Sequence, residues 1–436
     1  MLISNSFDSR ALASKVLPLR EQWEVRDRWL RERLDTLLPS LMVRTGTDMW
    51  VVVSDENNED PVTKTLLPSC LINARGKMIF VFIKEADGTV ARQCIAIPSG
   101  IEDLYQNEWY GMNSADWKGK QFKKPETTAF EFLAQLVSRC DPKTIAVNTD
   151  DIHYFADGLS HTNYTEMCKA LGEKYSKRLV SARHIVLAWL ETRCTSEMMA
   201  YEGIVRLAKS IIAECFTTRY VNPGITTNDD LRFAMMQRAI EMGLVPWFEC
   251  SVAIFRGGYP GMHGDTHVIM PGDIIHCDFG INYLGLCTDR QELAYILRHG
   301  ESEAPEGLRA ALKIGNRLQD IVISNIKEGC TGNEALANSR KMAGSEGIEP
   351  WIYTHAMGFD GHGAGARVGS FSNQGDSPAG DYPIYDNTAY ALELNAKVPI
   401  PEWDGQVLMT CLETEILLHG GKVHYLAGRQ EALHLI

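Results

Sequence analysis

One stretch, residues 272–296, constrains this chain more than any other. Its apolar, β-branched runs predict two β-strands joined by a tight turn, with Asp278 on the first strand and Asp289 on the second. The midpoint between these aspartates falls on Tyr283-Leu284, so a hairpin folded there sets the two carboxylates opposite each other, with Cβ atoms ~5 Å apart. Carboxylates at that distance repel unless a proton or a cation lies between them. A divalent metal is the cation that suits hard carboxylate oxygens.

A second pair of acids repeats this arrangement near the C-terminus. Glu393 and Glu413 have their midpoint at Trp403, which precedes an Asp-Gly turn signal. This pattern predicts strands over residues 390–398 and 406–418 that place the two glutamates opposite each other. Both glutamates lie in or beside apolar runs, and a buried acid requires a partner. Two hairpins with two acids each predict a pseudo-twofold site between two halves.

Histidines complete the set of candidate site residues. His355 and His362 lie in the segment 354–365, whose four glycines argue against a helix. Glycines in such numbers indicate backbone that packs close to another group, as a ligand-lined cleft requires. His276 shares a strand face with Asp278, and it either supports the site or is simply packed there.

The rest of the chain predicts two domains, residues 1–180 and 181–436. The first is an α/β domain without recognisable catalytic motifs, and the second contains the two hairpins. Thr227 is a candidate helix cap in the second domain. Helices are expected over residues 18–41, 125–137, 164–171, 196–220, 228–242, 305–327 and 333–343, and further strands over 49–53, 78–83, 89–97 and 144–147.

The net charge and the cysteine content limit the binding partners and the cellular compartment that we expect. The net charge of −13 makes nucleic acid an unfavourable partner, because an acidic chain repels phosphates. The 11 cysteines are odd in number and contain no Cys-x-x-Cys pair, which favours reduced thiols in a cytoplasmic protein. Residues 1–15 show no signal-peptide pattern, and no apolar run approaches the ~20 residues of a membrane span. We therefore expect a soluble cytoplasmic protein with no membrane partner.

The order and spacing of the candidate residues resemble those of a known family. They are similar to the pattern of the M24 metallopeptidase family. This pattern is Asp-x-Gly with a second Asp 11 residues on, then His-x-x-Gly-x-Asp-x-His-x-x-Gly, then two strand glutamates. Members of the family include aminopeptidase P, prolidase and methionine aminopeptidase, and the spacing from His355 to His362 is closest to the aminopeptidase P and prolidase branch. The resemblance covers residues 185–436 and, more weakly, the whole chain. It implies an α+β fold, with a creatinase-like α/β N-terminal domain and a C-terminal pita-bread (creatinase/aminopeptidase) domain.

The resemblance also implies roles for individual residues. Asp289 and Glu413 resemble the family's ligands that contact both of two divalent metals. His362 resembles the histidine that contacts the scissile carbonyl, and His263 is the candidate for the family's upstream histidine, with His267 as its alternative. The five implied metal ligands are Asp278, Asp289, His355, Glu393 and Glu413, and Glu393 is also the implied proton acceptor.

These residue types suit hydrolysis. Two ions ~3.5–4 Å apart can hold a water between them and lower its pKa toward neutral, so that a metal-bridged hydroxide attacks a polarised carbonyl. The resemblance implies Mn²⁺, and Co²⁺ or Zn²⁺ would also suit the ligands. It implies cleavage of a peptide C–N bond near the N-terminus, as in an Xaa-Pro aminopeptidase or an Xaa-Pro dipeptidase. Its substrate would be a short peptide, and the protein would be a homodimer.

Several positions depart from the family pattern. The family often has Thr-Arg shortly after the second aspartate, where this chain has Arg290-Gln291-Glu292. Aminopeptidase P relatives have an arginine two residues before the last glutamate and a histidine four before the metal histidine. Here those positions are Cys411 and Trp351. The departures leave the metal ligands intact and affect the residues that bind substrate.

Two alternatives therefore stay open. The first is a hydrolase of a small non-peptide amide, similar to creatinase or ectoine hydrolase. Creatinase-type relatives lack much of the acidic ligand set, which is complete here. The second is a non-catalytic binding protein on the same fold, although such relatives typically lose ligands and this chain has lost none.

Overall fold

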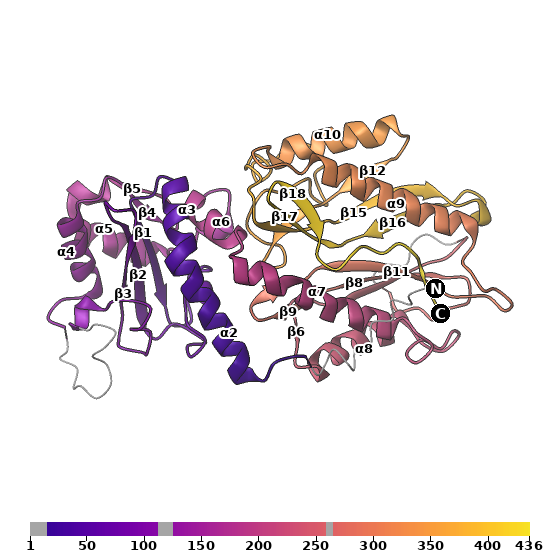
Figure 1. The fold of residues 1–436 in the computed structure, drawn as a ribbon, viewed down its shortest axis with the longest axis horizontal. Helices are drawn as coiled ribbons and strands as arrows, with labels where there is room; N and C mark the ends of the chain where they lie inside the picture. Colours follow the sequence, from indigo (N-terminus) through magenta and orange to yellow (C-terminus); the bar gives the residue numbers. More distant parts are fainter. Residues whose placement is uncertain (1–14, 112–124, 259–264) are drawn as a thin grey trace. The chain divides into compact units, whose positions relative to one another are not determined.

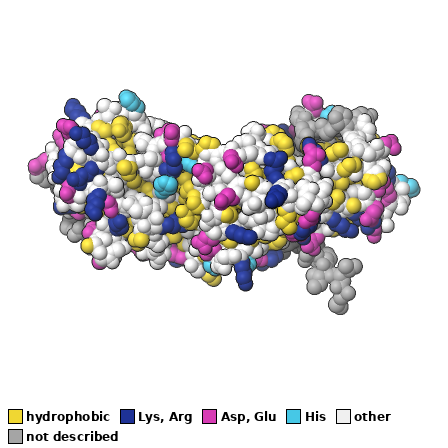
Figure 2. Space-filling model, turned by 90° about the horizontal axis from the view of Figure 1, so that it is seen from above, with side chains coloured by type: hydrophobic (Ala, Val, Ile, Leu, Met, Phe, Trp, Pro, Cys, Tyr) yellow, Lys and Arg dark blue, Asp and Glu magenta, His cyan; other side chains and the backbone are white. Residues whose placement is uncertain are grey.

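The computed structural model describes residues 15–111, 125–258 and 265–436. They form two compact units, Leu19–Leu190 and Glu191–Ile436, the latter together with residues 15–18. Figure 1 shows the N-terminal unit in indigo to magenta and the C-terminal unit in magenta to yellow. On the face shown in Figure 2, acidic and basic side chains lie interspersed with apolar ones. No helix within the described ranges is long and apolar enough to cross a membrane.

The N-terminal unit contains a five-stranded mixed sheet with the order β3-β2-β1-β4-β5. Its central strand β1 (Met49–Asp55) pairs antiparallel with β2 (Lys77–Lys84) and parallel with β4 (Ile145–Val147). The edge strands are β3 (Val90–Ile95) and β5 (Leu179–Ser181). The strands predicted over 49–53, 78–83, 89–97 and 144–147 are thus confirmed.

Helices cover both faces of this sheet (Figure 1). Alternation along β1 separates two cores. Val51 and Val53 pack with α4 and α5, whereas Trp50 on the other face contacts Phe82 and, edge to face, Trp189 of α6. The helices of this unit are α2 (Leu19–Glu32), the π-helical turn η1 (Arg33–Leu37), α3 (Leu38–Arg44), α4 (Ala129–Cys140), α5 (His161–Ser176) and α6 (Arg183–Glu191), and its short 3₁₀ turns are η2 (Thr63–Thr65), η3 (Glu108–Tyr110) and η4 (Tyr154–Ala156).

The C-terminal unit consists of two similar halves, each a helix pair over a hairpin. Helices α7 (Thr195–Cys215) and α8 (Asn228–Glu241) pack against β7 and β8. Helices α9 (Glu306–Asn325) and α10 (Gly332–Ser345) pack against β12, β15 and β16. The predicted pseudo-twofold layout is present, with the helices on the outside and the strands between them (Figure 1).

The described strands of this unit form four small sheets. The first sheet contains β7 (Ser251–Phe255), β8 (Ile274–Phe279), β11 (Arg290–Tyr295) and β19 (His434–Leu435), and the second contains β6 (Val245–Pro246), β9 (Ile281–Tyr283) and β10 (Leu286–Cys287). The third contains β12 (Pro350–Ile352), β15 (Leu394–Pro399) and β16 (Val407–Leu412), and the 3₁₀ turn η5 (Pro401–Trp403) joins β15 to β16. The fourth contains β13 (His355–Met357), β14 (Thr388–Ala391), β17 (Glu415–His419) and β18 (Lys422–Tyr425).

The first hairpin has a different register from the one predicted. Asp278 lies opposite Gln291, not opposite Asp289. The turn is centred on Leu284 and Gly285, whose φ angles of 56° and 84° are both positive, as a two-residue type I′ turn requires. Moving the turn by one residue moves the strand pairing by two, so Asp289 lies diagonal to Asp278 on the same face.

The second hairpin has the predicted register. Leu394 pairs with Leu412, which places the preceding Glu393 across from the following Glu413. Its strands are not continuous as predicted, however. Each breaks at its glutamate, because the chain passes there from one sheet to the next.

Two helix starts show how caps decide element bounds. The helix predicted to begin at Pro125 begins at Ala129, because Thr128 forms a capping box with the third residue of the helix. Thr227 caps α8 in the same way, as predicted.

Candidate metal centre

Strand ends of the C-terminal unit bring the predicted ligands to one place. Asp278 lies on β8, Asp289 directly precedes β11, and His355 is the first residue of β13. Glu393 lies between β14 and β15, and Glu413 lies between β16 and β17. Two hairpins and strand β13 therefore deliver one ligand set, whose first and last members, Asp278 and Glu413, lie more than a hundred residues apart in the chain.

The side chains converge closely enough to hold metal ions. Three groups each have ligand atoms that lie within 4.8 Å of one another: Asp278 with Asp289 and Glu413, His355 with Glu393 and Glu413, and Asp289 with His355 and His362. The structure thus brings together all five predicted ligands and His362. Asp289, His355 and Glu413 each occur in two of these groups, so the three groups form one continuous cluster.

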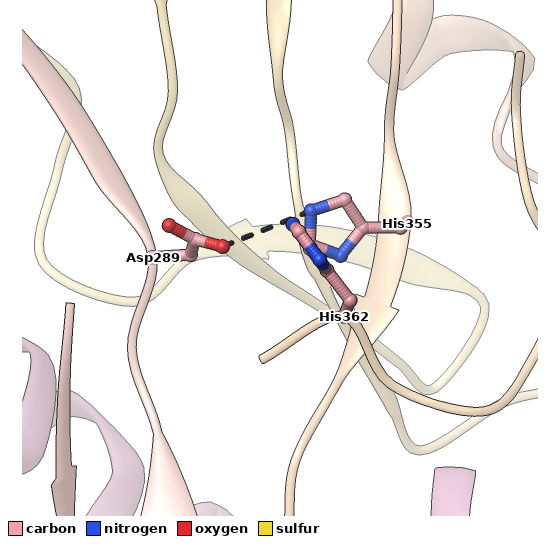
Figure 3. Close-up of side chains that lie close together, drawn as sticks. All are labelled: Asp289, His355 and His362. Atoms are coloured by element: carbon pink, nitrogen blue, oxygen red, sulfur yellow. Dashed lines mark ion pairs between the residues drawn. The ribbon is translucent and has the colours of Figure 1, made fainter. Parts of the chain in front are cut away.

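The histidines approach the acids without bonding to them. Nε2 of His355 lies 3.8 Å from Oδ2 of Asp289 and 3.7 Å from Oε1 of Glu413. Figure 3 shows His355 and His362 both directed toward Asp289. Their ring centroids lie 4.8 Å apart at an angle of 89°. The His355 distances exceed hydrogen-bond length and suit groups that share a cation rather than a proton.

Burial sets the electrostatics of the four acids. It raises the pKa of Asp278 to about 7 and, with added repulsion from Asp278, the pKa of Glu393 to about 8. Burial and repulsion between neighbouring acids also hold the pKa values of Asp289 and Glu413 well above their usual range. A cation among these carboxylates would favour their charged forms.

Burial acts in the opposite direction on the imidazoles. It lowers the pKa of His355 to about 3, with help from nearby His362, and it also lowers the pKa of His362. Neutral imidazole is the form that binds metals.

Buried polar atoms test whether these residues fit a metal. Oδ1 of Asp278, Nε2 of His355 and Oε1 of Glu413 are buried and accept no hydrogen bond from the residues that the structure describes. Nδ1 of His355 lies 3.2 Å from the carbonyl oxygen of Ala356, which leaves Nε2 as the electron-pair donor. Each orphaned atom is one that a divalent cation would bind, so the donor set fits a metal.

Sequence reasoning missed the group that links two of the acids. Nε2 of Gln291 donates to Oδ2 of Asp278 (3.3 Å) and to Oε1 of Glu393 (2.9 Å). Nε2 of His276 lies 3.0 Å from Oε1 of Gln291, so the imidazole donates and fixes the orientation of the amide. His276 therefore supports the site through Gln291. The available signal was strand alternation, because Gln291 lies two residues after Asp289 and shares its face.

A second missed group is Arg290, which is fully buried. Its guanidinium donates to Glu415 (2.6 Å), to Glu292 (3.1 Å) and to the hydroxyl of Thr414 (3.0 Å). This contact holds the residue after Asp289 against the residues after Glu413. Arg290, which departs from the family pattern, thus holds the two hairpins together as a structural clamp.

The glycine-rich segment packs as predicted. A Cβ on Gly361 would lie 2.0 Å from the indole of Trp247, and one on Gly358 would lie 2.9 Å from the guanidinium of Arg193. The same indole packs on His362, with ring centroids 5.4 Å apart. Close backbone approach to Trp247 therefore sets the position of His362.

The upstream histidine was predicted as His263 with His267 as the alternative. His263 lies outside the described residues. Within the described ranges, the candidate metal groups do not include His267, whose backbone N–H donates to Asn228.

A pocket of about 620 Å³ opens beside two of the acids. Asp278, Glu393, His276 and Gln291 form its polar end. The other lining residues are Ser251, Trp351, Tyr353, Phe371, Leu394, Asn395, Lys397, Met409 and Cys411. A volume in this range is typical of small-molecule sites.

The fold is shared with solved peptidase structures. The X-Pro aminopeptidase of Thermotoga maritima MSB8 superposes with a TM-score of 0.61 over 91% of this chain and 100% of that chain, at 16% identity. The Xaa-Pro dipeptidase of Bacillus anthracis gives a TM-score of 0.59 over 96% of this chain and 99% of that chain, also at 16% identity. These matches confirm the predicted pita-bread fold class.

Sequence comparison finds similarity to one peptidase family and to one curated relative. The chain is 24% identical over 180 residues to the uncharacterized peptidase YqhT of Bacillus subtilis (strain 168), a match that covers 40% of this chain and spans about half (47%) of that relative. Residues 202–408 match the model of metallopeptidase family M24. This stretch, about half of the chain, is therefore similar to a metallopeptidase family, the one that the resemblance implied.

Proposed function

We propose that this protein hydrolyses a peptide C–N bond near the N-terminus of a short peptide, as an Xaa-Pro aminopeptidase or an Xaa-Pro dipeptidase. The convergence of four acids and two histidines carries the proposal. The names of the solved structures that share the fold support the substrate class.

Two divalent ions, Mn²⁺ by resemblance, would be held by Asp278, Asp289, His355, Glu393 and Glu413, with Asp289 and Glu413 contacting both. Such ions supply an activated water and a polarised carbonyl when bound. The mutually repelling acids and the orphaned ligand atoms support this assignment.

The side chains of the protein would then bind, orient and move protons. The carboxylate of Glu393 accepts the proton of the attacking water, and Gln291 holds one of its oxygens at 2.9 Å. His362 donates a hydrogen bond to the carbonyl oxygen as negative charge develops there. Its ring packs against Trp247 and Tyr353, which restricts its rotation. His263 is proposed as the upstream proton donor.

One observation favours hydrolysis of a small non-peptide amide as the second candidate. Cys411 lines the pocket at the position where aminopeptidase P relatives have an arginine, and Trp351 lines it where they have a histidine. Substrate groups that those residues bind in relatives would find no equivalent partner here.

Compartment and assembly belong to the same proposal. All 11 cysteines are free thiols, which supports a reducing cytoplasmic location. The resemblance supports a homodimer, which light scattering of the purified protein would test.

Metal content and Xaa-Pro hydrolysis with and without Mn²⁺ test the main proposal. We expect about two metals per chain and Mn²⁺-dependent release of the first residue. Asp289→Ala is expected to lose both, whereas Asp151→Ala, whose side chain is 89% exposed in the N-terminal unit, retains both. Bound metal with cleavage of small amides but not of peptides would select the second candidate. An absence of bound metal after loading with Mn²⁺ would contradict the five-ligand assignment and leave a creatinase-like hydrolase or a non-catalytic protein.

A further inference from the structure

One aromatic side chain of the C-terminal unit lies against three segments of the candidate site. Trp247 follows β6, and the pairing of Pro246 with Ile281 of β9 holds its backbone against the first hairpin. Two glycines leave room for its indole, because a Cβ on Gly361 would lie 2.0 Å from an indole atom and one on Gly280 would lie 2.2 Å from another. A larger residue at either position would therefore displace the indole.

The indole N–H fixes the peptide group that precedes Asp289. Nε1 of Trp247 donates to the carbonyl oxygen of Thr288 at 2.6 Å. Thr288 and Asp289 lie in the break between β10 and β11, and this carbonyl belongs to the planar peptide group that joins the two residues. The direction of the carbonyl therefore sets the direction in which the backbone enters Asp289, whose carboxylate is a proposed metal ligand.

The same indole limits the movement of His362. The ring centroids of Trp247 and His362 lie 5.4 Å apart at an angle of 80°, which is an edge-to-face contact. His362 in turn lies with Asp289 and His355 in one of the three candidate metal groups. A shift of the indole would thus move a proposed metal ligand and the proposed hydrogen-bond donor together.

We propose that Trp247 is a positioning residue that couples the geometry of Asp289, through its indole N–H, to that of His362, through its ring. The inference rests on the proposed metal centre and peptidase function, and it has two separable consequences. Loss of the N–H alone disturbs Asp289 and weakens metal binding. Loss of the aromatic ring also releases His362, whose hydrogen bond to the developing oxyanion strengthens in the transition state.

Metal binding tests the link to Asp289. Trp247→Phe keeps an aromatic ring and removes the N–H, and we expect its affinity for Mn²⁺ to fall about 10-fold in calorimetric titration of the metal-free protein. Trp109→Phe is the matched control, because Nε1 of Trp109 donates to the carbonyl oxygen of Thr127 at 3.1 Å in the N-terminal unit. It loses the same kind of bond and should bind Mn²⁺ as the wild type does. Wild-type affinity in Trp247→Phe, or an equal loss in Trp109→Phe, would overturn the link.

Steady-state kinetics at saturating Mn²⁺ test the link to His362. For Trp247→Leu we expect kcat on an Xaa-Pro peptide to fall about 10- to 100-fold while KM changes less than about 3-fold, and Trp247→Phe should recover most of this loss. Rates are expressed per metal-loaded site, because an unfolded fraction would also lower kcat. A raised KM with unchanged kcat in Trp247→Leu would overturn this link. If the wild type cleaves no peptide, the peptidase proposal fails, and the Mn²⁺ titrations still decide the role of Trp247.

Discussion

Gln291 shows how one neutral side chain can organise charged neighbours. Its amide donates to Asp278 and to Glu393, two of the proposed ligands, while His276 fixes its orientation. An amide donor lowers the repulsion between two carboxylates without occupying the space of a cation. Groups that orient ligands in this way typically change metal affinity by 10–100-fold when they are removed.

Gln291→Met keeps the length of the side chain and removes the donor. We expect metal affinity to fall about 10–100-fold, measured by calorimetric titration of the metal-free protein with Mn²⁺. Gln237→Met, on the exposed face of α8, is the control and should bind Mn²⁺ as the wild type does. If Gln291→Met binds Mn²⁺ with unchanged affinity, the amide of Gln291 does not orient the ligands and its side chain only fills space.

Asp60 makes a pH-dependent contribution to stability in the N-terminal unit. Burial raises its pKa to about 7, although it accepts hydrogen bonds from the Asn148 amide and the Val62 N–H. Its folded pKa thus lies above the unfolded value of about 4, so the folded state binds the extra proton between these values. Stability from this group is complete below about pH 4 and is lost as the pH rises toward about 7.

Asp60→Asn removes this titration. Between pH 5 and 7 we expect the wild type to lose up to roughly 1 kcal/mol per pH unit more than the variant, in urea unfolding followed at several pH values. The comparison concerns slopes, so a change in absolute stability does not affect it. Asp151→Asn on the surface should keep the wild-type slope, and parallel curves for wild type and Asp60→Asn would refute the assignment.

At the scale of elements, Arg290 clamps the two hairpins together. It joins the start of β11 to Thr414 and to Glu415 at the start of β17, and every group in the contact is buried. Removing one partner of a buried ion pair leaves a charge without compensation. Arg290→Met should therefore destabilise the protein by about 3–5 kcal/mol in urea unfolding.

Two further variants separate lost charge balance from lost packing. Arg206→Met removes an exposed ion pair with Glu202 and should change stability by less than about 1 kcal/mol. The double variant Arg290→Met/Glu415→Leu should recover part of the loss, because no charge is then stranded at position 415. If the double variant is as unstable as the sum of both single variants, the clamp acts through shape rather than charge.

The turn of the first hairpin controls which residues face the centre. Gly285 has a φ of 84°, where a Cβ is strained, so Gly285→Ala should cost about 1–2 kcal/mol. Gly203 lies in the exposed middle of α7 with open space around its Cα, and Gly203→Ala should instead stabilise by up to about 1 kcal/mol. Opposite signs in thermal unfolding would show that backbone conformation, not the added methyl group, sets the effect.

For the whole molecule, the residues that the sequence identified were those defined by pattern. The acids and histidines of the metal centre were predicted because their residue types are unusual within apolar strands. The register predicted for the second hairpin was right because its Asp-Gly signal marks the turn. The register predicted for the first hairpin was wrong because Leu284 adopts a positive φ, which a leucine in the sequence does not predict. Gln291 and Arg290 were not assigned roles, since their functions depend on contacts between segments far apart in the chain.

Because one unit contains all the proposed ligands, metal binding should stabilise the protein by linkage. At a free Mn²⁺ concentration of 100 times Kd, one bound ion contributes about 2.7 kcal/mol, which corresponds to roughly 5–10 °C in Tm for a unit of this size. Chelation should reverse this shift, as measured by calorimetric scans with Mn²⁺ and with excess chelator. Asp289→Ala should show the same Tm in both conditions, whereas Asp151→Ala should respond as the wild type does. A Tm shift that persists in Asp289→Ala would place the stabilising ion elsewhere and contradict the five-ligand centre.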